Sequence, residues 1–280
     1  MSENFLRVSD EVRHAVAAGS AVVALESTIF THGLPRPRNV EVALQAEADL
    51  RAAGVVPATI GVVDGAAVVG LSAPEIERLG ADDAVIKVSL RDLPIASAKR
   101  LSGGTTVAAT AYLATKSGIS VFATGGLGGV HRGASTTFDE SADLPVLAAT
   151  PILMVSAGVK SILDVGASLE RLETLSITLV GYRTQRFPGF YLADSGFGID
   201  YSVDDPAEAA DLVRSRQALG ISGAVVVANP VPERESVERA VASAVKRAAW
   251  RPAFSNGEPV AVTDLLFRER VYVRRPRSKD

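Results

Sequence analysis

Three charged residues stand at or close to short apolar runs, where a charge is costly unless it has a partner or a chemical role. Glu26 follows the run 21–25, Lys160 comes shortly after the run 151–156, and Lys87 lies inside a third run. A glutamate can transfer protons in general acid–base catalysis. A neutral lysine amine can attack a carbonyl carbon and form an imine. These residue types predict proton transfer combined with covalent chemistry on a carbonyl compound.

Each of the three residues also has an ordinary structural explanation. Glu26 could be a capping residue, Lys87 could extend its flexible stem to water, and Lys160 could pair with Asp164 one turn later. Burial or a neighbouring cation would instead favour the neutral amine that an imine requires. We favour a functional role for Glu26 and Lys160 and leave both alternatives open for Lys87.

A glycine-rich break, 124–129, follows the apolar run 119–123. Its four glycines let the backbone come close to a ligand, and successive N–H groups in such a loop can bind an anion. His131 and Arg132 add donors and positive charge. The acidic residues that follow are Asp139, Glu140 and Asp143. The stretch is therefore either a phosphate-binding loop beside a site for a hard cation or a tight turn followed by a solvated acidic face.

A second glycine-rich break, 102–106, precedes an expected helix over 107–116. Hydroxyl groups and free N–H groups at the start of that helix could hold an anion or the edge of a base. A simple N-cap explains the same residues equally well.

The elements that must position these residues alternate between strand and helix. Valine and alanine dominate the apolar residues, which suits buried parallel strands. Asn39 is expected to cap a helix that ends at Gly54, and Asp64-Gly65 predicts a hairpin turn. The segment 26–38 is too irregular and polar for a strand or helix. Because open α/β sheets bind ligands at the carboxyl ends of strands, Glu26 lies where a ligand is expected.

Two further segments have recognisable patterns. Ser72 to Glu75 form a capping box at the start of a short helix. The long stretch 181–201 has no clear helix or strand pattern, and its length is typical of a lid over a site. A last helix is expected over 235–249, before a basic segment, 251–280.

The composition limits the class of protein. The chain has 280 residues, 47% hydrophobic residues, a net charge of −3 and no cysteine. Disulfides, thiolate metal sites and a cysteine nucleophile are thereby excluded, and a cytoplasmic enzyme is expected. The start of the chain lacks the apolar core of a signal peptide, and no run approaches the ~20 apolar residues of a membrane helix. Partners such as nucleic acid or a membrane are not expected.

Seven ordered blocks of sequence resemble one family, the pseudouridine-5′-phosphate glycosidases, also called pseudouridylate synthases. The resemblance covers about residues 7–235. The matching blocks are ALESTIFTHGLPRPRN (24–39), KVSLRDLP (87–94), GGTTVAATAYLA (103–114), FATGGLGGVHRGASTTFDESADL (122–144), AGVKSILD (157–164), RFPGF (186–190) and VANPVPE (227–233).

The resemblance implies cleavage of the C–C bond between uracil and ribose 5-phosphate with the help of Mn²⁺. Glu26 matches the family's proton donor, Lys160 the lysine that forms an imine with the sugar C1, and Asp139 the metal ligand. One ion per subunit is implied, with Mg²⁺ or another divalent cation as an alternative. The substrate-binding positions assigned on this basis are Lys87, Thr124, the backbone at Val107, His131, Ser141, Ala142 and Asp143.

The resemblance also implies an α/β/α sandwich with a mixed, mostly parallel central sheet and a homotrimer. We expect one catalytic domain over residues 1–250 and a divergent basic tail over 251–280. In that tail Val262 to Leu266 match the family only weakly, and an asparagine that resembles a base-recognition residue is lacking.

The divergent tail keeps two alternatives open. The first is a C-glycosynthase that joins ribose 5-phosphate to an aromatic polyketide aglycone. The second is a catalytically inactive sugar-phosphate binding protein, which the retained Glu26, Lys87, Asp139 and Lys160 argue against. We favour pseudouridine 5′-phosphate as the substrate, with uracil as the base.

Overall fold

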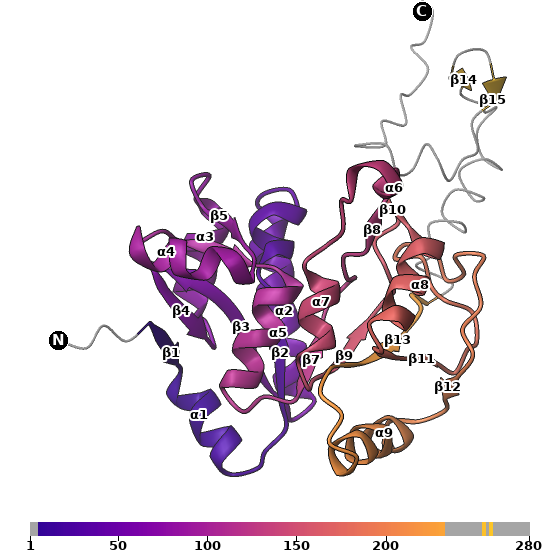
Figure 1. Ribbon diagram of the computed structural model, residues 1–280. Coiled ribbons are helices and arrows are strands. Elements are labelled where there is room, and N and C mark those ends of the chain that lie inside the picture. Colours follow the sequence, from indigo (N-terminus) through magenta and orange to yellow (C-terminus); the bar gives the residue numbers. More distant parts are fainter. Residues whose placement is uncertain (1–4, 233–253, 256–257, 260–280) are drawn as a thin grey trace, which may run out of the picture.

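The computed structural model describes residues 5–232, 254–255 and 258–259 (Figure 1). A mixed, mostly parallel sheet of eleven strands forms its centre, and only the pairs β3–β4 and β3–β6 are antiparallel. The strands in order along the sheet are β1 (Leu6–Val8), β4 (Ala66–Val69), β3 (Val56–Val63), β2 (Val22–Leu25), β7 (Val121–Ala123), β9 (Leu153–Ser156), β13 (Val225–Ala228), β11 (Thr178–Tyr182) and β12 (Ser202–Val203). Two more strands branch from β3: β6 (Gly103–Thr105) and its parallel partner β5 (Ile86–Val88).

Helices cover both faces of this sheet, which confirms the predicted α/β/α sandwich (Figure 1). The helices are α1 (Asp10–Ala17), α2 (Arg38–Ala52), α3 (Ala73–Ala81), α4 (Leu93–Ala98), α5 (Val107–Lys116), α6 (Ala134–Thr137), α7 (Asp143–Ala148), α8 (Val165–Thr174) and α9 (Pro206–Ala218). A π-helical turn spans Ile29–Gly33, and a 3₁₀ turn spans Leu90–Asp92. Among the described residues, no helix is long and apolar enough to cross a membrane.

Two short ribbons lie outside the main sheet. β8 (Val130–His131) pairs antiparallel with β10 (Leu163–Asp164). β14 (Phe254–Ser255) pairs antiparallel with β15 (Glu258–Pro259). The predicted helix 235–249 lies outside the described residues, as does the predicted tail 251–280 apart from this second ribbon.

The core is built from small and branched apolar residues. All four residues of β13 are buried, as expected for a strand covered on both faces. Seven of the ten residues of α5 are buried, and six of those seven are Val, Ala or Leu, whose side chains have no polar group to satisfy. Phe122 of β7 and Leu127 in the glycine-rich break are fully buried in the same cluster. The core therefore continues directly beneath the break.

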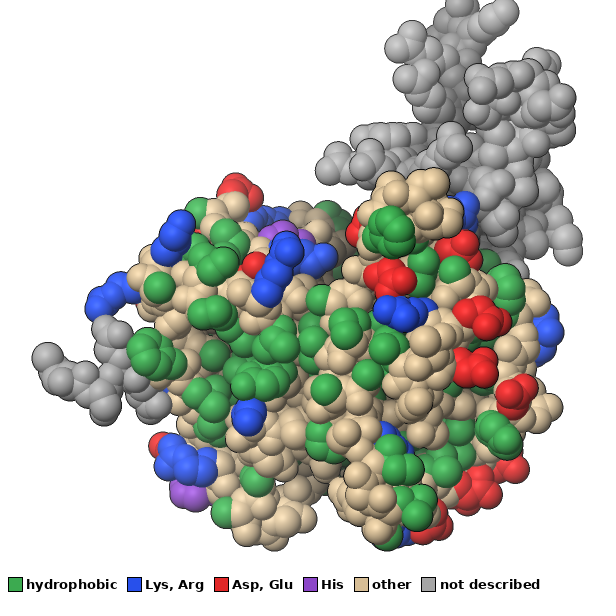
Figure 2. Space-filling view, viewed as in Figure 1, with side chains coloured by type: hydrophobic (Ala, Val, Ile, Leu, Met, Phe, Trp, Pro, Cys, Tyr) green, Lys and Arg blue, Asp and Glu red, His purple; other side chains and the backbone are tan. Residues whose placement is uncertain are grey.

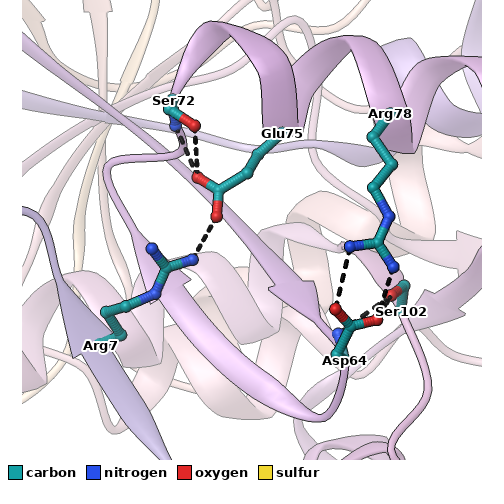
Figure 3. Close-up of polar contacts among 6 residues, drawn as sticks. All are labelled: Arg7, Asp64, Ser72, Glu75, Arg78 and Ser102. Atoms are coloured by element: carbon teal, nitrogen blue, oxygen red, sulfur yellow. Dashed lines mark hydrogen bonds and ion pairs between the residues drawn. The ribbon is translucent and has the colours of Figure 1, made fainter.

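Local signals placed several elements correctly. The Ser72 side chain and the Glu75 side chain form the predicted capping box at α3. Asp64 and Gly65 connect β3 to β4 in the predicted hairpin. Figure 3 shows how α3 holds this region: Glu75 also pairs with Arg7 of β1, and Arg78 pairs with Asp64.

Three expectations were wrong at the local level. Asn39 is not an N-cap, because it lies inside α2, which begins at Arg38, and it is almost completely buried. Its side-chain amide donates to Phe30 O (2.7 Å) and Gly80 O (2.9 Å) and ties α2 to α3. The segment 26–38 contains the π-helical turn, and the break 102–106 contains strand β6.

Candidate active site

Nine of the ten predicted site residues line one cavity of about 550 Å³. They come from segments spread over residues 26–160: the end of β2, β5, the start of α5, β8, the segment leading into α7, the first residue of α7, and the residues after β9. The nine are Glu26, Lys87, Val107, His131, Asp139, Ser141, Ala142, Asp143 and Lys160. The tenth, Thr124, contacts the cavity's Glu26 from the neighbouring strand end.

Glu26 is held between two hydroxyl groups at the end of β2. The residue is 8% exposed, and Thr28 Oγ1 donates to Oε2 while Thr124 Oγ1 donates to Oε1. Neither carboxylate oxygen accepts from a helix N-terminus, so capping does not explain this residue. Because each hydroxyl has a single proton and gives it to Glu26, the carboxylate is fixed in place and can receive a proton. Thr28 was not assigned a role from the sequence.

Lys160 reaches the cavity from a short segment tied to the glycine-rich break. Its backbone N–H donates to Leu127 O (3.1 Å), and its carbonyl accepts from Leu163 N (2.9 Å). Asp164 caps α8 instead of pairing with the lysine, since its Oδ1 accepts from Ala167 N (3.0 Å). The alternative that Lys160 serves an ion pair with Asp164 is therefore wrong. The lysine is partly buried and stands at the cavity wall.

Lys87 lines the same cavity with an exposed side chain on β5. Its charge is felt by a neighbour: the pKa of His32 is lowered first by burial and then by the positive charge of Lys87. His32 Nδ1 lies 2.8 Å from Thr31 Oγ1. His32 itself does not line the cavity, whereas Lys87 does.

Asp143 acts as a buried clamp between two elements of the cavity wall. Its Oδ1 accepts from Ala108 N (2.9 Å) in the first turn of α5, and its Oδ2 accepts from Gly128 N (2.8 Å) in the glycine-rich break. The hydroxyl of Thr106 lies 3.5 Å from Ala109 N. Protein oxygens therefore occupy three of the N–H groups that were expected to be free for an anion, and anion binding by the remaining ones stays a prediction.

Ser141 closes this arrangement from the other side. Its N–H donates to Gly129 O (2.9 Å), and its Oγ accepts from Asp143 N (3.2 Å). A Cβ at Gly128 would collide with the side chains of Ser141 and Asp143. The glycine is thus required for the close approach of the break to α7, in addition to any contact with a ligand.

Asp139 and His131 form the exposed acidic edge of the cavity. His131 N donates to Asp139 O (3.0 Å), and His131 Nδ1 lies 3.8 Å from Asp139 Oδ2. The neighbouring Glu140 is already paired with Arg171 at 2.8 Å. Within the described ranges, no group of three or more His, Asp or Glu residues could hold a metal ion. A divalent cation at Asp139 would accordingly keep several waters, which is how Mg²⁺ is commonly bound.

Ser89 and Arg91 were not assigned a role from the sequence. Both line the cavity together with Lys87. They add a hydroxyl and a second cation to the wall that Lys87 begins. The cavity therefore combines an acid, an amine, cations and an exposed carboxylate, which is a set suited to an anionic carbonyl compound.

Several known proteins are similar to this chain in sequence and in fold. A family model described as indigoidine synthase A like protein matches residues 11–269. A relative from Saccharopolyspora erythraea, named pseudouridine-5′-phosphate glycosidase, is 62% identical over 250 residues, covering 89% of this chain and 82% of the relative. The crystal structure of the prealnumycin C-glycosynthase AlnA in complex with ribulose 5-phosphate has a TM-score of 0.78 and 38% identity, covering 88% of this chain and 81% of that one. An indigoidine synthase A-like protein from Thermotoga maritima has a TM-score of 0.77 and 34% identity, covering 90% and 82%.

Proposed function

The chain belongs to the indigoidine synthase A like protein family of enzymes, and from this premise we propose that it reversibly cleaves the C–C glycosidic bond of pseudouridine 5′-phosphate. The products are uracil and ribose 5-phosphate. One observation carries the proposal: Glu26 and Lys160, a proton carrier and an amine, line the same cavity although they come from opposite halves of the described chain. The relative named pseudouridine-5′-phosphate glycosidase supports the choice of substrate.

The reaction needs an electron sink at C1 of the sugar, because a carbon leaving group departs far less readily than a nitrogen. Glu26 passes a proton to the ring oxygen, the C1–O bond breaks, and the Lys160 amine bonds to C1. The attached nitrogen, now a secondary ammonium, returns a proton to Glu26, and Glu26 then supplies this proton to the base carbon. As the C–C bond breaks, its electron pair stays with that carbon, and the nitrogen lone pair forms the C1=N imine. Water hydrolyses the imine, which releases ribose 5-phosphate and restores Lys160.

The two threonines beside Glu26 support its double role. Both hydroxyl groups donate to the carboxylate and hold it in one orientation. Glu26 can then take a proton from the Lys160 ammonium, which yields the neutral nucleophile and the protonated acid in one transfer. General acid–base catalysis of this kind contributes ~10²–10⁴-fold to a rate.

We further propose that Asp139 holds one Mn²⁺ or Mg²⁺ ion. The exposed carboxylate, with His131 at 3.8 Å, fits an ion that retains waters and meets substrate oxygens. When bound, the ion supplies positive charge toward the phosphate. Lys87 and Arg91 hold the opposite side of the anion, and Ser141 orients the segment that carries Asp139. The homotrimer and the cytoplasmic location stay predictions.

The likeness to a C-glycosynthase favours one alternative function. The same half-site could join ribose 5-phosphate to an aromatic carbon nucleophile instead of uracil. Both reactions share the imine, so they differ only in the molecule placed beside Glu26.

Trapping of the imine tests the proposal. With ribose 5-phosphate and borohydride, wild-type protein is expected to gain the mass of one reduced sugar phosphate on Lys160. Lys160→Arg should give no adduct, whereas Lys99→Arg, at an exposed position after α4, should give the wild-type yield. Ligand binding without any adduct in wild type would contradict the enzyme mechanism and support a binding protein.

A second assay separates the two enzymatic alternatives. Protein, ribose 5-phosphate, Mn²⁺ and uracil are incubated, and pseudouridine 5′-phosphate is measured by mass spectrometry. Formation of the product supports the glycosidase. A trapped imine without any pseudouridine 5′-phosphate would refute uracil as the partner.

A further inference from the structure

A compact loop, 186–195, lies inside the long stretch that follows β11, and its own hydrogen bonds close it. Gly189 N donates to Leu192 O (2.9 Å), and Ser195 N donates to Phe187 O (2.9 Å). The side chain of Phe187 is fully buried and anchors the loop in the core. Compact surface loops that are packed by their own residues are frequently functional. Because this loop is bonded to itself, it can support the segments that it contacts.

The first of these segments leads to Lys160. Phe190 N donates to Ala157 O (2.9 Å). A Cβ at Gly158 would collide with Pro188 O, so only a glycine permits this close approach of the two backbones. The loop therefore fixes the backbone two residues before Lys160.

The second segment is the glycine-rich break, which the Phe190 ring contacts directly. A Cβ at Gly126 would collide with this ring, and a Cβ at Gly125 would lie 3.4 Å from it. The Tyr191 ring packs edge-on against the Phe190 ring, with 4.2 Å between the ring centroids. Phe190 does not line the active-site cavity. The ring thus supports the break from outside the cavity.

The break and the segment that leads to Lys160 are also joined to each other. The three backbone hydrogen bonds between them, each of 3.1 Å, run from Ala157 N to Gly125 O, from Leu127 N to Gly158 O, and from Lys160 N to Leu127 O. Thr124 begins the break and donates to Glu26. The alignment of these two segments therefore sets where the Lys160 amine stands relative to the Glu26 carboxylate.

The backbone of Phe190 is strained in this position. Its φ of 65° lies in the left-handed region, which is unfavourable for any residue with a Cβ. Strain of this kind persists only where surrounding contacts offset it, and it is concentrated at functional sites. At Phe190 the offsetting contacts are the hydrogen bond to Ala157 and the packing of the ring on Gly126.

We propose that Phe190 is a positioning residue for the Lys160 amine. The proposal rests on the proposed function, because imine formation is the step that it serves. In that step the amine nitrogen bonds to C1 of open-chain ribose 5-phosphate, and the carbonyl oxygen leaves as water. The Phe190 ring holds the break and the lysine segment in one alignment, so that the amine meets C1 beside Glu26. Misplacement of a reacting group by about 1 Å can cost ~10²-fold in rate.

Truncation of the ring tests this role. Phe190→Leu stays apolar but covers less of the break. We expect the rate at which borohydride traps ribose 5-phosphate on Lys160, measured at saturating sugar phosphate, to fall at least ~10-fold. The dissociation constant of ribose 5-phosphate should stay within about twofold, because Lys87 and Arg91 lie on another segment. Calorimetry measures this constant in a Lys160→Arg background, where no imine forms.

Two further variants are the controls. Phe190→Tyr preserves the ring and should trap ribose 5-phosphate at a rate within about twofold of wild type. Tyr201→Leu removes an exposed aromatic ring that follows the same loop, and it should change neither the rate nor the affinity. Urea unfolding establishes that each variant is folded in the assay. If Phe190→Leu fails to fold, Phe190→Met replaces it with the same expectation.

The outcomes distinguish this proposal from the proposed function. A trapping rate in Phe190→Leu equal to that of wild type would overturn the positioning role and leave the imine intact. A weaker affinity for ribose 5-phosphate with an unchanged trapping rate would make Phe190 a binding residue and would also contradict the proposal. Absence of any adduct in wild type would instead refute the imine itself, and with it the step that Phe190 is proposed to serve.

Discussion

At the level of single residues, the three carboxylates of the site differ in the hydrogen-bond donors that surround them. Glu26 accepts two hydroxyl protons, Asp143 accepts two backbone N–H groups, and Asp139 is largely exposed to solvent. The sequence identified all three as acidic residues of interest. It could not distinguish their environments, because the partners of Glu26 and Asp143 lie on other strands and helices. The resemblance assigned Asp143 to the substrate, whereas the structure commits both of its oxygens to the protein.

The Asp143 clamp leads to a prediction about stability. Asp143→Ala leaves the N–H groups of Ala108 and Gly128 buried without acceptors, and each costs ~1–3 kcal/mol. Asp143→Asn keeps one acceptor oxygen but turns an N–H₂ group toward the other donor. We therefore expect the free energy of unfolding, measured with urea, to fall most in Asp143→Ala and less in Asp143→Asn.

A matched control separates this effect from loss of charge. Asp49 is an exposed residue of α2 whose carboxylate accepts from Gln45. Asp49→Asn should change the unfolding free energy by less than ~0.5 kcal/mol. If Asp143→Ala were as stable as Asp49→Asn, the clamp would be without energetic importance.

At the scale of elements, local signals were predictable and distant contacts were not. The capping box of α3, the Asp64-Gly65 hairpin and the bounds of α5 follow from neighbouring residues alone. β6 looked like a break because two of its three residues are glycine. Glycine is required at both positions because residues from other segments lie where a side chain would be. A Cβ at Gly103 would collide with Val88, and one at Gly104 would collide with Thr31.

Asn39 is a second residue whose role depends on distant contacts that the local sequence does not predict. An asparagine before an apolar pattern favours an N-cap. In the structure its amide instead donates to carbonyls of the π-helical turn and of α3. No local pattern encodes such a bond, because both acceptors depend on the final packing of α2.

The junction of β1 with α3 leads to a prediction about pH. Burial acts to raise the pKa of Glu75, but the hydrogen bond from Arg7 and the bonds from Ser72 hold it below its usual value of 4.5 (Figure 3). A depressed carboxyl pKa stabilises the fold above pH 4.5 and loses that contribution as the pH falls through the folded value. Glu75→Gln preserves the capping box, which accepts Gln, and removes only the charge.

We expect Glu75→Gln to lower the unfolding free energy by ~0.2–1 kcal/mol at neutral pH. The difference from wild type should close as the pH falls below 4.5 and through the lowered pKa of Glu75, because the carboxyl then becomes protonated in the folded state. Urea denaturation at a series of pH values measures it, with Glu77→Gln, an exposed neighbour on α3, as the control. A difference that does not shrink at any pH below 4.5 at which the protein stays folded would show that the charge of Glu75 is not responsible.

At the scale of the whole molecule, the cavity exists only because the sheet brings distant segments together. β2 and β7 are adjacent in the sheet, and β9 is next to β7, so Glu26, the glycine-rich break and the segment carrying Lys160 end at one edge. The rule for parallel sheets predicted a ligand at this edge. That rule could not predict which strand ends are neighbours. The family resemblance instead placed Glu26, Lys160 and the glycine-rich break in one site.

The charges of the molecule are distributed unevenly around this edge. The net charge is −3, yet Figure 2 shows Lys, Arg and His side chains gathered between β5 and α7, while Asp and Glu side chains gather over α8 and α9. A phosphate-bearing substrate is attracted to the first region and repelled by the second. The amino-acid composition gives only the net charge and does not reveal that positive and negative side chains gather in separate regions.

Metal binding at this edge gives the last prediction. If Asp139 holds a divalent cation, binding to the folded state alone stabilises the whole protein by ~2.7 kcal/mol at a free concentration 100 times the dissociation constant. After treatment with EDTA, wild type and Asp139→Asn should unfold at similar temperatures, since the Asp139 carboxylate is exposed and makes no short ion pair. Added Mn²⁺ should raise the unfolding temperature of wild type and leave that of Asp139→Asn unchanged.

Asp211→Asn, on α9, is the control and should respond to Mn²⁺ like wild type, because Asp211 pairs with Arg214 outside the cavity. Ribose 5-phosphate should stabilise all three proteins, and equal stabilisation of Asp139→Asn and wild type by Mn²⁺ would place the ion elsewhere.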